Sequence, residues 1–101
     1  MRISIAQEGR DAAALARLGR LLADARGYRV LASDGRQVGI VDHVRYERHS
    51  DHPDQVVVRR RRAISRRLRA VPFDEVGAVD PSERTVVLRT NPAAIDRLPA
   101  L

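Results

Sequence analysis

The spacing of apolar residues changes once along the chain, near Gly27. From Asp11 to Arg26, apolar side chains recur every three to four residues, which is the period of an amphipathic helix. Asp11 fits the N-cap position, and Gly27 fits a left-handed stop. Before this helix, Ile3 and Ile5 alternate with polar residues, which predicts one short strand. The apolar stripe of the helix consists of Ala14, Leu15, Leu18, Leu21, Leu22 and Ala25.

Three leucines, Leu15, Leu18 and Leu22, form the centre of this stripe. A surface helix ordinarily buries its apolar stripe on its own domain, so core packing is the first interpretation. A homo-oligomer face or a partner-docking face on the same leucines stays open. Polar replacements at Leu18 and Leu22 would dissolve an oligomer in the second case and unfold the monomer in the first.

After Gly27 the apolar period drops to two, which is typical of β-strands. Asp34 and Gly35 predict a tight hairpin turn in which the glycine supplies a positive φ. Gly39 marks a bend in the long second strand, and short strands at such even spacing favour a small barrel. The expected strands cover residues 28–33, 37–48, 55–60, 67–71, 76–79 and 84–89.

Two proline-containing segments bound the last elements. Pro72 removes a backbone donor and is therefore expected at a strand end or edge, followed by Phe73, which we expect to fill one barrel mouth as a core residue. At the carboxyl end, Asn91 fits an N-cap and Pro92 the first helical position. A short helix over residues 93–98, stopped by Pro99, is predicted there.

Charge is concentrated in one stretch of the chain. Seven of the 19 basic residues, all arginines, lie in an eleven-residue run, while the net charge of the whole chain is +6. A positive field of this density attracts phosphates, acidic protein surfaces or anionic head groups. The alternative is a solvated face in an arginine-rich composition without a dedicated partner. The residues of the run are Arg59, Arg60, Arg61, Arg62, Arg66, Arg67 and Arg69.

The run must leave the regular strand at some point, because successive side chains on a strand face opposite sides of the sheet. One of those sides should be the interior, where an unpaired arginine is costly. We therefore expect the strand to end by about Arg61, with residues 62–66 as an exposed hairpin tip and the arginine side chains outside.

Several classes of function find no support in the sequence. The absence of cysteine removes disulfides and thiolate sites, and the lack of a signal peptide or a membrane-length apolar run predicts a cytoplasmic protein. The loop containing His49, Asp51, His52 and Asp54 has neither triad geometry nor a full ligand set, so no catalytic residues, metal or cofactor are expected. His43 is expected to be a surface histidine, and no glycine-rich phosphate loop is present.

Residues 28–90 resemble the PRC-barrel family, which includes the cytoplasmic domain of the photosynthetic reaction-centre H subunit and the C-terminal domain of the ribosome maturation factor RimM. The resemblance implies a mainly β, six-stranded antiparallel barrel that works as a docking module without catalytic side chains. Residues 1–27 would form an extension packed on a domain of residues 28–101. The matching residues are Asp34-Gly35, Gly39-Ile40-Val41, Asp42, Val44, Val56 to Val58, Val71-Pro72-Phe73, Val76, Val79-Asp80 and Val86-Val87-Leu88.

These observations predict a non-enzymatic adaptor that docks an acidic protein surface through its arginine-rich hairpin. The alternative is an RNA-binding or ribosome-associated protein that binds nucleic acid without sequence preference. The run could neutralise several phosphates, but it contains no aromatic residue on which single-stranded bases could stack. A salt series with RNA separates the two functions, because phosphate binding weakens steeply with salt.

Overall fold

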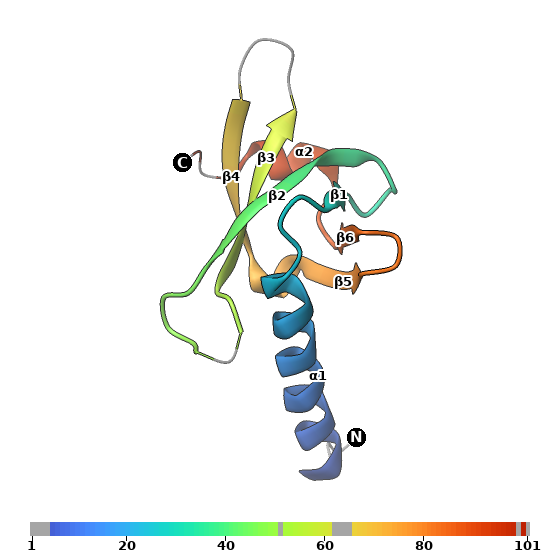
Figure 1. Ribbon diagram of the computed structural model, residues 1–101, viewed down its shortest axis with the longest axis vertical. Coiled ribbons are helices and arrows are strands. Elements are labelled where there is room, and N and C mark those ends of the chain that lie inside the picture. Colours follow the sequence, from blue (N-terminus) through green and yellow to red (C-terminus); the bar gives the residue numbers. More distant parts are fainter. Residues whose placement is uncertain (1–4, 51, 62–65, 99, 101) are drawn as a thin grey trace.

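The computed structural model describes residues 5–50, 52–61, 66–98 and 100 as a curled sheet with a helix at each end of the chain (Figure 1). Its extents of 50 × 28 × 27 Å show one long axis. The β3–β4 pair reaches one end of that axis and α1 projects from the other. The elements are α1 (Ile5–Ala23), β1 (Arg29–Leu31), β2 (Gln37–Arg45), β3 (Gln55–Arg61), β4 (Arg66–Pro72), the 3₁₀ turn η1 (Phe73–Glu75), β5 (Val76–Asp80), β6 (Thr85–Leu88) and α2 (Pro92–Asp96).

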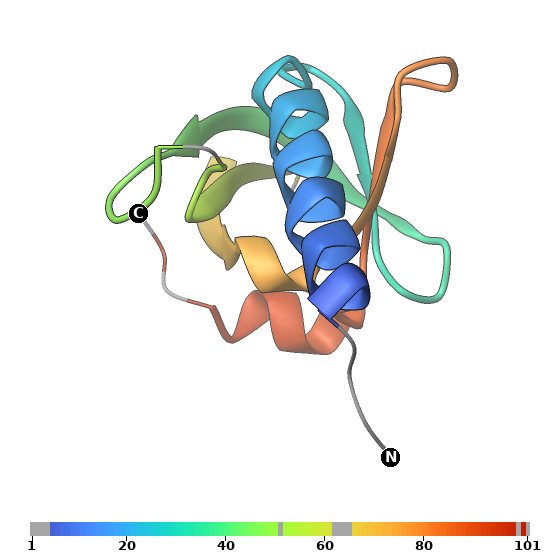
Figure 2. The same ribbon diagram turned by 90° about the horizontal axis from the view of Figure 1, so that it is seen from below.

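The six strands form one mixed sheet in the order β4-β3-β2-β1-β6-β5. Four neighbouring pairs are antiparallel, but β1 and β6 run parallel. No hydrogen-bonded pairing joins the outer strands β4 and β5 in the described part of the chain, so the expected closed antiparallel barrel is wrong in both closure and orientation. The sheet curls instead, because η1 carries the chain directly from one outer strand to the other (Figure 2).

The core lies inside this curl and is built almost entirely from aliphatic side chains. On β3, the alternate residues Val56 and Val58 are fully buried in it. Leu22 of α1 and Ile95 of α2 are also fully buried, so each helix closes part of the interior with an apolar side chain. Val57, between the two valines of β3, is also fully buried but lies outside this core cluster, as the alternation of side chains on a strand requires.

Helix α1 differs from its prediction at both ends. It begins at Ile5, so Asp11 lies inside the helix and is not its N-cap, and it ends at Ala23. Ile5 is helical rather than extended, whereas Ile3 lies outside the described residues. Gly27 has the expected positive φ of 85°. The helix is longer than expected because five alanines between residues 6 and 16 carry helical propensity past the end of the apolar stripe.

The first hairpin forms as the turn residues predict. Gly35 has a φ of 88°, and Asp34 accepts a hydrogen bond from the backbone N–H of Arg36. Gly39 lies at an irregularity of β2, and its lack of a side chain also permits β2 to approach β3, because a Cβ at this position would lie 2.5 Å from the carbonyl oxygen of Arg59. The irregularities of β2 fall beside it, as register shifts against β1 and β3.

The proline-bounded segments also match their patterns. Pro72 ends β4, and Phe73 lies in the core at 5% exposure on the following turn. In α2, the Asn91 side chain accepts a hydrogen bond from the N–H of Ala94 at 2.8 Å, and Pro92 occupies the first turn. The other boundaries lie within two residues of expectation, except that β2 ends at Arg45 instead of residue 48.

Candidate interaction surface

The arginine run lies on two adjacent antiparallel strands. Backbone pairing sets Arg60 opposite Arg67 and Arg61 opposite Arg66 at the end of the β3–β4 pair. Arg66 is therefore a strand residue instead of part of a hairpin tip, whereas β3 ends at Arg61 as expected. Arg62 and the rest of the proposed tip lie outside the described residues.

Two arginines of the run are buried, which contradicts the expectation that all their side chains lie outside. Arg60 is 9% exposed and Arg69 is 8% exposed. Both lie on the face of the sheet that carries Val56 and Val58. Arg69 is the direct partner of Val58, and Arg60 lies two residues after Val58 on the same strand. The alternation that buries the valines continues into the arginines and carries them inward.

An acid on α2 compensates one of these buried charges. Arg60 Nη2 lies 3.1 Å from Asp96 Oδ1, while Arg60 Nη1 and Arg69 Nε have no hydrogen-bond partner. Unsatisfied buried donors of this kind destabilise the fold. A cavity of about 240 Å³ lies beside Arg60 and is also lined by Gln37, Val38 and Gly39.

Arg59 lies on the opposite face of β3 from Arg60. Its guanidinium is 3.6 Å from Asp42 Oδ1, and Asp42 Oδ2 accepts a hydrogen bond from His43 Nδ1 at 2.6 Å. The Arg59 side chain is 41% exposed, and His43 is exposed as expected. Because Asp42 is shared between a histidine and an arginine in partly solvated surroundings, it offsets the local positive charge only weakly.

No local pattern signals the two acids that pair with this run. Asp96 is far from Arg60 along the chain and comes beside it only because α2 packs against β4. Asp42 lies on β2 and meets Arg59 through the β2–β3 pairing. A search for acids at helical spacing would find neither, since both contacts are made across the fold.

The polar loop at the other end of β3 is organised by one carboxylate. Asp54 Oδ2 accepts hydrogen bonds from the backbone N–H groups of Glu47 and Arg48 at 2.6 and 2.8 Å, and Asp54 Oδ1 is 2.7 Å from His49 Nδ1. These donors, the Glu47 N–H first, hold the pKa of Asp54 well below its ordinary value. The His52 ring stacks on Phe73, with ring centroids 4.5 Å apart.

These contacts make the loop a structural feature. No group of three or more His, Asp or Glu side chains within the described residues is placed to hold a metal ion. Asp51, one of the loop acids considered above, lies outside them. Asp54 accepts its hydrogen bonds from donors of its own loop, which explains the presence of an acidic residue at this position.

The three leucines of the α1 stripe have different surroundings. Leu22 is fully buried, Leu18 packs partly against the core, and Leu15 is 47% exposed. The stripe therefore serves as core at its carboxyl end and lies open to solvent towards its amino end. No helix among the described residues has the length and hydropathy that a membrane span requires.

Comparison with known proteins gives a structural likeness and no sequence match. No family model matches the chain, and no curated protein matches it. Among solved structures, it is similar to the putative 16S ribosomal RNA processing protein RimM from Pseudomonas aeruginosa, with a TM-score of 0.54 and 18% identity. The match covers 72% of this chain but only 43% of that protein, and at this identity it concerns the fold alone. It supports a fold like that of the PRC barrels.

Proposed function

We propose that the chain is a non-enzymatic binding module that docks an acidic protein surface through the arginine-rich end of the β3–β4 pair. The residues that would contact the partner are Arg59, Arg61, Arg62 and Arg66, together with Arg67, which pairs with Arg60 near the end of the two strands. Arg60 and Arg69, which are buried, would support this surface from behind.

One observation carries the proposal: like charges stand directly opposite each other in the sheet. The pairs Arg60–Arg67 and Arg61–Arg66 follow one another at the end of two strands. Opposed like charges in a sheet are destabilising, and an anionic partner would remove that repulsion. The described acids nearby are Asp42 and Asp96, which pair with Arg59 and Arg60.

A protein partner fits the surroundings of Arg60 better than a base does. The cavity beside this arginine, at about 240 Å³, has room for a carboxylate side chain and is lined by polar Gln37. No aromatic side chain lies in the run to stack on a base. Arginine binds carboxylates with two parallel hydrogen bonds, so an aspartate- or glutamate-rich surface matches the chemistry present.

The test is a fluorescence titration with two labelled probes, a glutamate- and aspartate-rich peptide and an RNA hairpin, across a salt series. The variant carries Arg61→Gln, Arg62→Gln, Arg66→Gln and Arg67→Gln. The control variant removes equal charge from four exposed arginines elsewhere, through Arg29→Gln, Arg36→Gln, Arg89→Gln and Arg97→Gln. We expect the first variant to lose peptide binding by about ten-fold or more and the control to keep most of it.

Equal loss in the two variants would contradict the proposal, because net charge rather than this surface would then explain binding. Failure of the wild-type chain to bind the acidic peptide would contradict it as well. RNA binding is the second candidate, favoured by the fold likeness to a protein described as processing 16S ribosomal RNA. It predicts tight RNA binding. The logarithm of the binding constant should then fall linearly with the logarithm of the salt concentration, with a slope of about −0.7 to −0.9 per phosphate contacted.

A further inference from the structure

We propose that Asp96 occupies the position that a partner's carboxylate takes at Arg60, so that the C-terminal segment competes with an acidic partner for the arginine-rich end of β3–β4. The C-terminal segment comprises the described residues 92–98 and 100. The inference rests on the proposed function, and it adds how the partner reaches Arg60, which lies behind the exposed arginines.

The contact between Asp96 and Arg60 has the chemistry that an acidic partner would use. Arg60 Nη2 lies 3.1 Å from Asp96 Oδ1, whereas Arg60 Nη1 is buried and has no hydrogen-bond partner. A guanidinium can hold one carboxylate through two parallel hydrogen bonds, so the contact with Asp96 leaves part of this capacity unused. A partner's carboxylate that bonds both terminal nitrogens would therefore replace Asp96 with a gain in hydrogen bonding.

The ion pair is open to solvent on the side of the acid. The side chain of Asp96 is 40% exposed, while that of Arg60 is 11% exposed. One carboxylate can therefore replace the other from the solvent side while the sheet keeps Arg60 in place. The cavity of about 240 Å³ that is lined by Arg60 and the first residues of β2 gives an incoming side chain room beside this arginine.

The helix that carries Asp96 is short and weakly held. α2 has five residues, fewer than the roughly 12 to 15 below which an isolated helix is marginal in water. Ile95 is the buried residue within it, and Leu98, which follows the helix, packs partly against the core. Rotation of the Asp96 side chain into solvent leaves Ile95 in the core, so the exchange of carboxylates requires no unfolding of α2.

The C-terminal segment also reaches the second buried arginine of the run. α2 packs against β4 (Figure 1), and Ala100 forms an isolated antiparallel bridge with Arg69 of that strand. Because β4 is an outer strand of the sheet, its free edge is the side on which an added strand would pair. One segment thus contacts both inward-facing arginines, with an acid at Arg60 and a strand-like contact at Arg69. An extended acidic segment of a partner protein would match both contacts.

The test is a fluorescence titration of the full chain with the labelled glutamate- and aspartate-rich peptide, in which Asp96→Asn is compared with wild type. Asparagine keeps the shape of the side chain but removes the charge that competes for Arg60. We expect Asp96→Asn to bind the peptide about five- to ten-fold more tightly, because the chain no longer has to release its own acid before it binds.

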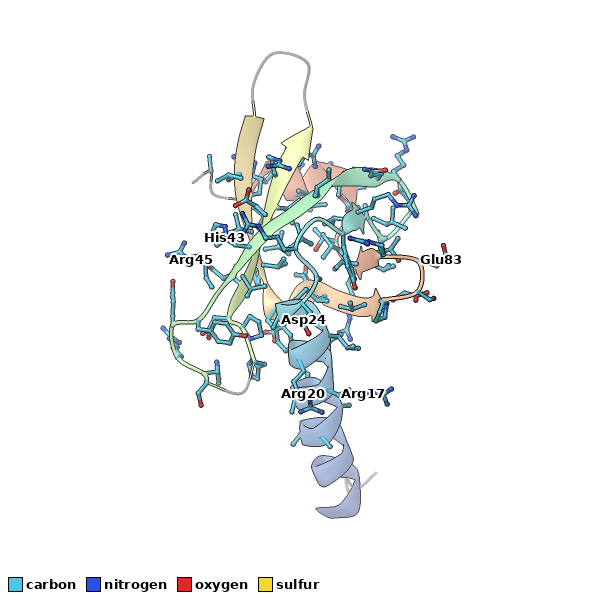
Figure 3. The ribbon with its side chains drawn as sticks, in the orientation of Figure 1. Arg17, Arg20, Asp24, His43, Arg45 and Glu83 are labelled. Carbon is cyan, nitrogen blue, oxygen red and sulfur yellow. The ribbon has the colours of Figure 1, made fainter. Side chains whose placement is uncertain are left out.

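Glu83→Gln is the matched control for charge. Glu83 is an exposed acid on the turn between β5 and β6, away from the β3–β4 pair (Figure 3). Its replacement removes the same charge as Asp96→Asn, but salt screens charges that lie far from the binding surface. The peptide affinity should therefore change by less than about two-fold in this control.

Two further measurements test whether the gain depends on Arg60 and on movement of α2. In a chain that carries Arg60→Met, adding Asp96→Asn should change the peptide affinity by less than about two-fold, because the guanidinium for which the two acids compete is absent. In wild type, the NMR signals of the Ile95 and Arg97 amides should shift as the peptide binds. Circular dichroism of each variant checks that it is folded under the conditions of the titration.

The inference is wrong if Asp96→Asn binds the peptide no more tightly than wild type, if Glu83→Gln gains as much, or if the gain persists with Arg60→Met. Unchanged α2 amide signals at saturation of wild type would also overturn it. The proposed function would survive each of these results, provided that the variant with four arginines replaced still loses peptide binding. If neither wild type nor Asp96→Asn binds the peptide, both proposals are wrong.

Discussion

The two ends of β3 differ in how far their charged groups are compensated. At the Gln55 end, the carboxylate of Asp54 receives hydrogen bonds from the loop that precedes it, so charge and donors are matched locally. At the Arg61 end, arginine positions pair with arginine positions across two strands, and two buried nitrogens, Arg60 Nη1 and Arg69 Nε, have no partner.

This difference is the reason for which we propose the arginine end as the binding end. At the loop end the carboxylate already has its donors, although Gln55 Oε1 is buried without a partner, whereas at the arginine end the unsatisfied groups are cationic donors, which gain free energy when an anion binds. Under the proposed function, the same strand would be structural at one end and would bind a partner at the other. The three predictions below test this contrast.

The largest effect is expected at Gly39, beside the arginine end. A Cβ there would lie 2.5 Å from the carbonyl oxygen of Arg59 and 2.7 Å from a methyl carbon of Val58, so Gly39→Ala forces β2 away from β3. We expect a loss of about 3 kcal/mol in the free energy of unfolding, measured by urea denaturation. Gly77→Ala is the control, because its nearest contact would be 3.4 Å, and it should cost less than about 1 kcal/mol. If Gly39→Ala and Gly77→Ala lower the free energy of unfolding equally, β2 and β3 can move apart at Gly39 without a large loss of stability.

The next effect concerns the ion pair between Asp96 and Arg60. Asp96→Ala leaves the guanidinium of Arg60, whose side chain is 11% exposed, without this carboxylate, and we expect a loss of about 2 kcal/mol in the free energy of unfolding. Glu47→Ala, which removes an exposed pair with Arg45 at 3.4 Å, should change it by less than about 0.5 kcal/mol.

A double variant sharpens this prediction. Adding Arg60→Met to Asp96→Ala removes the buried charge together with its acid, so most of the lost stability should return. If the double variant is less stable than Asp96→Ala alone, Arg60 stabilises the fold through other contacts. The free-energy cost of burying its unpaired charge is then smaller than expected.

The smallest effect is expected at the loop end and depends on pH. The hydrogen bonds to Asp54 hold its pKa low in the folded chain, so its stabilising contribution is present above the pKa of the unfolded chain and is lost as pH falls through the folded pKa. Asp54→Asn should therefore be less stable than wild type at neutral pH, and the gap should close in strong acid. Urea midpoints across pH, with NMR of the Glu47 and Arg48 amides, would measure this.

Asp80 provides a comparison for that titration. Its pKa is also lowered, chiefly by the Ser82 hydroxyl and then by the Glu83 N–H, so Asp80→Asn should show the same direction of pH dependence. A gap between Asp54→Asn and wild type that widens in acid would contradict the assigned role of the loop carboxylate.

Local rules in the sequence predicted most of the elements. The period of two placed the strand that begins at Gln55, the Asp34-Gly35 pair placed a turn with positive φ, and Asn91 with Pro92 placed the start of α2. Each of these features depends on residues within a few positions of one another, where backbone geometry and hydrogen bonding decide the outcome.

The same rules failed where distant segments meet. The alternation of side chains also carries Arg60 and Arg69 inward, although we expected no buried arginine. The expectation failed for Arg60 because Asp96 on α2, from a distant part of the chain, compensates its charge. The parallel pairing of β1 with β6 had no local signal, since either strand could pair in either direction.

By itself, the order of residues determined where strands, turns and helices lie and where positive charge gathers, because those properties arise from neighbouring positions. The tertiary structure alone decided that the sheet stays open and mixed, which arginines are buried, and that half of α1 stands clear of the core. These outcomes depend on contacts between residues far apart in the chain, whose energies become definite only when the whole fold brings them together.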